Sequence, residues 1–444
     1  MSELHDQAHG LVLKYVENSQ AEFLNFLSHY VRFKSVNPDM LADRAKIEMR
    51  GCQEWLANEI RDWHIFDEVD LIGSALEQPN VVARRKGCGD GKALLFNGHS
   101  DVVPVTPEQE RVWHAGTPFG GEVIDGKLCG RGASDMKGGN AAFLWAIRAL
   151  GDTGIQLKGD LLATMVSGEE TGNHKIGVDC LAEAGYTAPF CIIAEPTDMR
   201  IAPANMGEFY FMIQIQGLST SLVSRHLAVN PGPFGAAVQG VNAIDKMYKI
   251  QSALYNLDRE WAVWQRHPLM APGNMNINLS RIHAGDIYSA MADQCELTGS
   301  VLYNPALTYE DALAEFKRAI EGVVQSDYWL LEHPPVLTVP YMLDHKPPVN
   351  LPPDHPGCQK MIEAFRKVLN QEPVLSCMSG TTDGAYLSAR GQPLLTFGAA
   401  GLDGVHGANE CVDVEMLVQS IKIYAYFALE YCGIANIGAS PLET

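Results

Sequence analysis

The spacing of apolar residues predicts how the first hundred residues are organised. Apolar side chains recur at every third or fourth position over residues 10–35, which is the period of one helix face. The residues in this pattern are Leu11, Leu13, Val16, Phe23, Leu24, Phe26, Leu27 and Val31. A second helix is predicted over residues 44–63. Short apolar runs then predict strands at residues 66–71, 80–84 and 93–98.

The next hundred residues continue this alternation. Residues 119–132 are glycine-rich and predict a hairpin or loop, after which a helix runs from about 133 to 150. Strands at 160–166 and 190–194 flank a helix near 176–184. Strands that alternate with helices, with polar residues at the strand ends, predict an α/β domain with a mostly parallel sheet.

Near residue 203 the pattern changes. The elements now follow the order β-α-β-β-α-β, which is typical of a ferredoxin-like α+β unit. They are expected at residues 209–216, 238–250, 275–282, 294–302, 309–324 and 335–340. The α/β pattern resumes after a proline-rich stretch. We therefore predict a catalytic domain formed by residues 1–202 and 346–444, into which a second domain, residues 203–345, is inserted.

Composition narrows the classes of function. The chain has 444 residues, 46% of them hydrophobic, and a formal net charge of −20, which argues against nucleic acid and anionic membranes as partners. No apolar run is long enough to span a bilayer, and the N-terminus does not resemble a signal peptide. The ten cysteines are scattered without a Cys-x-x-Cys motif, which predicts free thiols and a cytoplasmic protein.

The strand predicted at residues 93–98 leads directly into a candidate site. It ends in Asn97-Gly98 and is followed by His99-Ser100-Asp101. Open α/β sheets carry their chemistry at the carboxyl ends of their parallel strands. A histidine that binds a metal usually needs a second group to fix its tautomer, and Asp101 is placed to be that group.

Further carboxylates and a second histidine follow other predicted elements of the same domain. They are Asp135, Glu169, Glu170, Glu195 and His406. Two imidazoles and several carboxylates suit zinc, and two metal ions 3.5–4 Å apart need a bridging ligand such as a carboxylate. Since neighbouring residues do not easily bind one ion together, the Glu169-Glu170 pair suggests one ligand and one general base. Such a base would take a proton from a metal-bound water with a pKa near 7.

The sequence motifs that contain these residues resemble those of a known family. The segments are Gly98-His99-Ser100-Asp101-Val102-Val103-Pro104, Gly130-Arg131-Gly132-Ala133-Ser134-Asp135-Met136-Lys137-Gly138-Gly139, Ser167-Gly168-Glu169-Glu170, Ala194-Glu195-Pro196-Thr197, Thr382-Asp383-Gly384 and His406-Gly407. In this order they resemble the co-catalytic zinc hydrolases that include aminoacylases, acetylornithine deacetylase, succinyl-diaminopimelate desuccinylase and glutamate carboxypeptidase. The resemblance extends over essentially the whole chain.

The resemblance implies a role for each matched residue. His99 and Glu195 would bind one Zn²⁺, Glu170 and His406 a second, and Asp135 would bridge them. Glu169 would be the general base, and Asp101 would orient His99. Co²⁺ or Mn²⁺ could occupy the same ligands. The inserted domain would act as a lid and join two subunits into a homodimer, and the substrate would be a small-molecule amide.

The inserted domain departs from the family pattern. Where members commonly carry a histidine that polarises the substrate carbonyl, this chain has Ser221, with His226 five residues further on. Either His226 takes that role, or the position is altered, or the donor comes from elsewhere. Leu302 stands where arginine is frequent. Thr382, Asp383 and Gly398 are candidates for the substrate end of the site.

These features predict a di-zinc hydrolase of N-acyl amino acids or related small amides, with Glu169 as base. Three alternatives stay open. The first is a dipeptidase or carboxypeptidase with the same metals, and the second is an atypical deaminase or carbamoyl-amide hydrolase. The third, a non-catalytic metal-binding protein, is favoured only by the altered lid.

Overall fold

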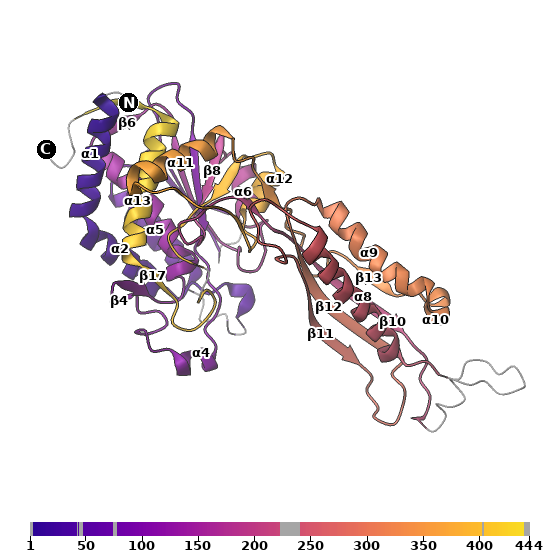
Figure 1. The fold of residues 1–444 in the computed structure, drawn as a ribbon. Helices are drawn as coiled ribbons and strands as arrows, with labels where there is room; N and C mark the ends of the chain where they lie inside the picture. The colour runs from indigo at the N-terminus through magenta and orange to yellow at the C-terminus, as the bar shows by residue number, and fades with distance from the viewer. Residues whose placement is uncertain are drawn as a thin grey trace, which may run out of the picture. The chain divides into compact units, whose positions relative to one another are not determined.

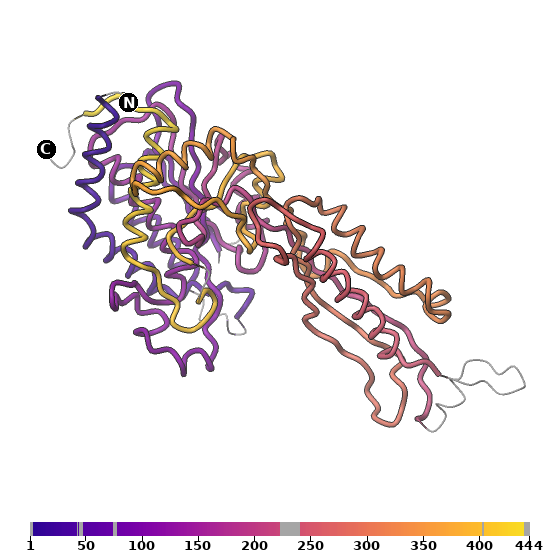
Figure 2. Tube along the Cα trace, in the orientation of Figure 1, coloured from indigo at the N-terminus to yellow at the C-terminus, as the bar shows by residue number. Residues whose placement is uncertain are grey.

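The computed structural model describes residues 3–41, 43, 48–73, 78–222, 240–401 and 404–438. It divides into two compact units. The first consists of residues 1–204, 351–378 and 382–444, and the second of residues 205–350 and 379–381. In Figures 1 and 2 both the indigo N-terminal and the yellow C-terminal segments belong to the first unit, while the middle of the chain forms the second. The sequence placed the two boundaries at residues 203 and 345.

The main sheet of the first unit has parallel strands at its centre. Its order is β1-β2-β7-β3-β8-β16-β9, and β15 also pairs with β9. Neighbours among β7, β3, β8 and β16 are parallel, whereas β1, β2 and β9 join antiparallel. The strands are β1 (Glu68–Ile72), β2 (Asn80–Arg85), β3 (Leu94–His99), β7 (Leu161–Val166), β8 (Phe190–Ile193), β9 (Ile201–Asn205), β15 (Leu375–Met378) and β16 (Leu394–Thr396).

The central strands are continuously apolar because both faces of the sheet are covered. Every residue of β3, β7 and β8 is buried, as parallel strands between layers of helices require. The longer helices of this unit are α1 (Glu3–Asn18), α2 (Gln20–Arg32), α3 (Met49–Asp62), α5 (Gly138–Asp152), α11 (Pro356–Leu369) and α13 (Val414–Cys432). Helix α5 is buried almost throughout and packs against α13. The α/β fold class predicted from the sequence is confirmed.

Two smaller sheets complete this unit. One has the order β17-β5-β4 and the other pairs β18 with β6. Asp125-Gly126 turns the hairpin between β4 and β5, as its composition predicted. The remaining elements are η1 (Pro38–Met40), α4 (Pro107–Val112), β4 (Glu122–Ile124), β5 (Lys127–Cys129), η3 (Ala133–Lys137), β6 (Ile155–Leu157), α6 (Val178–Glu183), α12 (Gly384–Ala389), β17 (Cys411–Asp413) and β18 (Ile434–Ile437).

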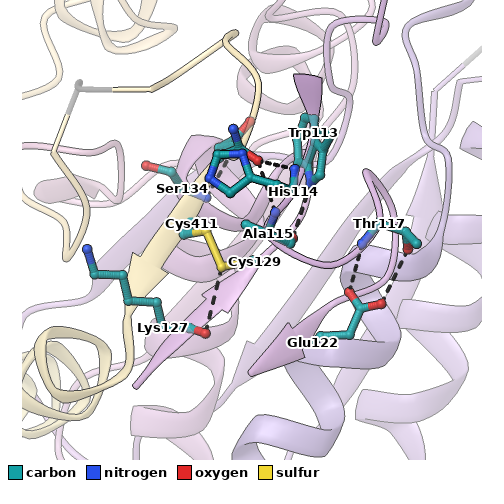
Figure 3. The surroundings of a disulfide bond; sticks show 11 residues. Trp113, His114, Ala115, Thr117, Glu122, Lys127, Cys129, Ser134 and Cys411 are labelled. Atoms are coloured by element: carbon teal, nitrogen blue, oxygen red, sulfur yellow. Dashed lines mark hydrogen bonds between the residues drawn. A yellow bond between two sulfur atoms is a disulfide. The ribbon is translucent and has the colours of Figure 1, made fainter. Parts of the chain in front are cut away.

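The prediction that all cysteines are free was wrong. Cys129 at the end of β5 and Cys411 at the start of β17 form a disulfide across 282 residues of chain, and Figure 3 shows it between the two strands. The pair is in register in the antiparallel ladder, which brings the two Cβ atoms together. The remaining eight cysteines are free. Spacing along the sequence did not reveal the pair, because only the folded sheet makes the two strands neighbours.

The second unit is a ferredoxin-like sandwich, as predicted. Its antiparallel sheet has the order β11-β12-β10-β13. Alternate residues of β10, from Phe209 to Ile215, are buried, while the residues between them are more exposed, so this sheet has one apolar face. The elements are β10 (Gly207–Gln216), α8 (Ala243–Trp264), β11 (Asn276–Ala284), β12 (Gln294–Tyr303), α9 (Tyr309–Gln325), α10 (Tyr328–Glu332), β13 (Val336–Thr338) and β14 (Val349–Asn350). Across the residues that the structure describes, no helix has the length and apolar character needed to cross a membrane.

Candidate metal centre

Strand β3 carries His99 at its carboxyl end, in the buried centre of the sheet. The side chain is 1% exposed. Asn140 of α5 donates a hydrogen bond to the His99 carbonyl at 2.6 Å. A Cβ on Gly98 would lie 2.0 Å from the Asn140 Oδ1 atom. Only glycine therefore allows α5 to approach the strand closely enough to hold His99 in this way.

Asp135 lies between two groups of candidate metal ligands. Its Oδ1 is 3.0 Å from His99 Nε2, and its Oδ2 is 3.3 Å from His406 Nε2. Glu195 Oε1 is 3.5 Å from the same nitrogen of His99, and Glu170 Oε2 is 3.1 Å from that of His406. The structure thus brings together all five ligands expected from the sequence, in groups that share Asp135.

The other ring nitrogen of His99 faces Asp101. His99 Nδ1 is 2.9 Å from the Asp101 carbonyl oxygen and 3.6 Å from its Oδ1. The backbone oxygen is therefore the closer acceptor for an Nδ1 proton. Asp101 Oδ2 in turn accepts hydrogen bonds from Asn37 Nδ2 at 2.7 Å and from the Glu170 backbone N–H at 3.2 Å. With Nδ1 hydrogen-bonded to the Asp101 carbonyl oxygen, Nε2 is the nitrogen of His99 that can bind a metal ion once it has lost its own proton.

Three carboxylates face two histidines in this cluster, so negative charge would exceed positive charge with all five groups ionised. Burial, and then the negative charge of Asp135, raise the pKa of Glu170 to about 7 and that of Glu195 to about 8. Hydrogen bonds to Asp135 and Glu170 raise the pKa of His406 to about 10. Burial opposes ionisation of Asp135, but hydrogen bonds from His406 and His99 outweigh it and lower its pKa.

A divalent cation would relieve this imbalance. Glu170 Oε1 is buried without a hydrogen-bond partner among the described residues, although buried carboxylate oxygens are normally paired. Each group offers one imidazole nitrogen and two carboxylates, a donor set that suits Zn²⁺ and also other first-row divalent ions. The residues present therefore fit a pair of metal ions.

Glu169 is buried next to this cluster but belongs to neither ligand group among the described residues. Its negative charge contributes to the raised pKa of both Glu195 and Asp101. The two adjacent glutamates therefore differ in position: Glu170 faces His406, while Glu169 lies outside the ligand groups.

The candidate substrate residues have mixed positions. Thr382 and Asp383 are buried just before α12, and Thr382 Oγ1 accepts a hydrogen bond from the Gly384 N–H at 3.1 Å. Gly398 packs beneath a metal-ligand segment, since a Cβ there would lie 2.3 Å from the Glu195 carbonyl oxygen. His226 lies outside the described residues. Ser221 is exposed, at a bridge to Ala290 in the second unit.

Sequence reasoning missed two buried charged residues next to these ligands, Arg131 and Glu410. They pair with each other. Arg131 lies within the Gly130–Gly139 segment, four residues before Asp135, whereas Glu410 lies three residues after the His406-Gly407 motif. The presence of a buried charge in each loop could have been suspected, but the pairing could not.

A protein-family model and a curated relative each match most of this chain. A model of Peptidase family M20/M25/M40 matches residues 95–430. The N-formyl-4-amino-5-aminomethyl-2-methylpyrimidine deformylase of Bacillus subtilis (strain 168) is 31% identical over 439 residues, covering 96% of this chain and 98% of its own length.

Solved structures share the fold at lower identity. An M20 metallo-carboxypeptidase from Sulfolobus solfataricus superposes with a TM-score of 0.68 at 17% identity, over 92% of this chain and 99% of its own. A dinuclear metal-binding peptidase of the same family from Bacillus subtilis gives a TM-score of 0.61 at 18% identity, over 93% of this chain and 99% of its own.

Proposed function

The chain belongs to peptidase family M20/M25/M40, and we propose that it hydrolyses a small N-acyl amide at a centre of two zinc ions. Membership confirms the resemblance drawn from the motifs, and with it a metal-dependent hydrolase of C–N bonds. The proposal concerns the identity and number of the ions, the roles of individual residues and the substrate.

The main evidence for a centre of two ions is the position of Asp135. Each of its carboxylate oxygens faces a different histidine, which is the arrangement of a ligand that bridges two ions. His99 and Glu195 would complete one site, and Glu170 and His406 the other. When bound, the ions supply Lewis-acid activation of the scissile carbonyl and of water.

Glu169 would perform the proton transfers. It is buried beside the ligands and belongs to neither ligand group among the described residues, which is the position expected of a general base rather than of a ligand. It would accept the proton of the attacking water and pass it to the departing amine. Asp101 would hold the tautomer of His99 through its backbone oxygen and, from further away, its carboxylate.

We infer an acyl or formyl amide of an amine without a neighbouring carboxylate as the preferred substrate. Leu302 takes the place at which family members often have the arginine that would pair with a substrate carboxylate. The relative that is 31% identical is named as a deformylase of an aminopyrimidine, a substrate of this class. N-acyl amino acids and dipeptides are the competing substrates that a panel must include.

The second unit would join two copies of the chain. β11 forms an edge of its sheet, and exposed apolar side chains line α8, among them Tyr248, Tyr255 and Trp264 at 68%, 52% and 79% exposure. A strand edge that has no partner strand among the described residues, beside exposed aromatic residues, favours a homodimer. We propose a cytoplasmic location, because eight of the ten cysteines are free thiols, as they are in a reducing compartment.

Glu169→Gln tests the mechanism. We expect turnover on a panel of formyl amides, N-acyl amino acids and dipeptides to fall by at least about 10²-fold, which is the lower end of what a general base contributes. Metal content should remain at two ions per chain. Loss of metal together with activity would make Glu169 a ligand and refute its proposed role.

A further inference from the structure

Glu410 lies behind the loop that carries Asp135. It is 1% exposed, and its Oε1 accepts hydrogen bonds from three backbone N–H groups of that loop. The donors are Gly132, Ser134 and Asp135, at 3.0, 3.0 and 3.1 Å. Three amide donors that converge on one carboxylate oxygen form a strong anion site. The backbone is thereby fixed at the very residue whose side chain joins the two ligand groups.

The other oxygen of Glu410 pairs with the guanidinium of Arg131, which is also 1% exposed. Arg131 Nη2 donates to the Gly407 carbonyl at 3.1 Å, one residue after His406. A planar guanidinium can hold two acceptors at once. Arg131 therefore connects the Asp135 loop, through Glu410, to the loop that carries His406.

His406 depends on such a connection more than the other ligands do. Its side chain is 50% exposed, so packing does little to hold it. Its φ of +60° lies in the left-handed region that residues other than glycine rarely adopt. Gln109 donates to the His406 carbonyl at 2.8 Å, and so supports the same backbone from α4.

We propose that Glu410 and Arg131 are positioning residues of the metal centre, which hold the Asp135 and His406 loops at the separation that two bound ions require. This inference rests on the proposed two-ion function. The pair suits the task because its opposite charges cancel, so it adds no net negative charge beside three ligand carboxylates. Groups that orient metal ligands typically contribute 10–100-fold to metal affinity.

The test compares stepwise Zn²⁺ dissociation constants, measured by competition with a chromophoric chelator, in the wild-type protein and two variants. Glu410→Gln keeps an acceptor for the N–H groups but removes the charge that faces Arg131. Since Asp135 serves both ligand groups, we expect both dissociation constants to rise by about 10–100-fold. Gln109→Ala removes one hydrogen bond to the His406 loop, so one constant alone should rise, by about 2–10-fold.

Glu122→Gln is the matched control. Glu122, in β4, accepts hydrogen bonds from the backbone N–H and the hydroxyl of Thr117, as Figure 3 shows, and neither bond involves a loop that carries a candidate ligand. Its substitution should leave both constants unchanged. The visible spectrum of Co²⁺-loaded protein gives a second comparison, because it reports ligand geometry independently of turnover.

The outcomes distinguish a failure of the two-ion centre from a failure of the inference about Glu410. Wild-type protein that binds fewer than two ions would refute the two-ion centre itself. Two ions in the wild type, with unchanged constants in folded Glu410→Gln protein, would make Glu410 a purely structural residue and overturn this inference. If Glu410→Gln does not fold, Arg131→Lys decides, because lysine keeps the charge but cannot hold Glu410 and the Gly407 carbonyl together in one planar group: a rise in at least one constant supports the inference, and no rise overturns it.

Discussion

Binding of metal to the apo protein should release protons, because the ligand cluster holds them in place of cations. Near pH 7, His406 carries a proton, since its hydrogen bonds to Asp135 and Glu170 raise its pKa to about 10. The pKa of His99 is also well above its usual value: burial lowers it, but the charge of Glu195 and the bond to Asp135 prevail. Both imidazoles must lose a proton to bind a metal.

Two of the carboxylates contribute as well. With pKa values of about 8 and about 7, Glu195 is mostly protonated at neutral pH and Glu170 is about half protonated. Together the four groups should release about three protons when two ions bind at pH 7. Ionisation of a bound water would add at most about one more.

Titration calorimetry of chelator-treated protein with Zn²⁺, in buffers of different ionisation enthalpy, measures this number directly. The release should fall between pH 7 and 9, as Glu170 and then Glu195 lose their protons before the metal arrives. Release of fewer than about one proton at pH 7 would contradict the charge balance derived for the cluster. So would a release that does not change with pH.

Two further predictions concern the scaffold. Gly398→Ala should destabilise the apo protein by about 1–3 kcal/mol and weaken metal binding, because the added Cβ would lie 2.3 Å from the Glu195 carbonyl oxygen. Urea unfolding against Gly322→Ala, where a Cβ meets nothing within 4 Å, checks this, and equal stability of the two variants would refute it. For the disulfide, we expect eight of the ten cysteines to react with an alkylating agent in denaturant without reductant. Reduction should lower the free energy of unfolding by about 2–4 kcal/mol, while ten reactive thiols would exclude the Cys129–Cys411 bond.

The sequence was sufficient to predict that His99, Glu170 and Glu195 lie near one another, because each ends or follows a buried strand. His99 ends a continuously apolar strand, and Glu170 and Glu195 lie just beyond two others. The carboxyl ends of parallel strands meet at one edge of a sheet, so ligands far apart in the chain converge once the strand order is guessed. The ferredoxin-like order of the second unit was readable for a related reason, since its strand and helix periodicities are regular.

Partnerships between irregular segments were not readable in this way. Arg131 and Glu410 are 279 residues apart, and the short strand Cys411–Asp413 that brings them together has no periodicity to detect. The disulfide was not predicted for the same reason. In each case the sequence shows a polar or sulfur-bearing residue in a loop, and only the pairing of β17 with β5 supplies its partner.

Glu410 also shows why a motif match underestimates a site. The His406-Gly407 motif was identified by its histidine, which the metal would contact directly, and it ends before Glu410. In the structure, Glu410 accepts hydrogen bonds from three backbone N–H groups of the Asp135 loop. A carboxylate that accepts hydrogen bonds from backbone N–H groups does not require particular side chains in its partners, so no sequence pattern marks the interaction. Such supports have to be found from burial and hydrogen bonding, because the residues they hold can be of any type.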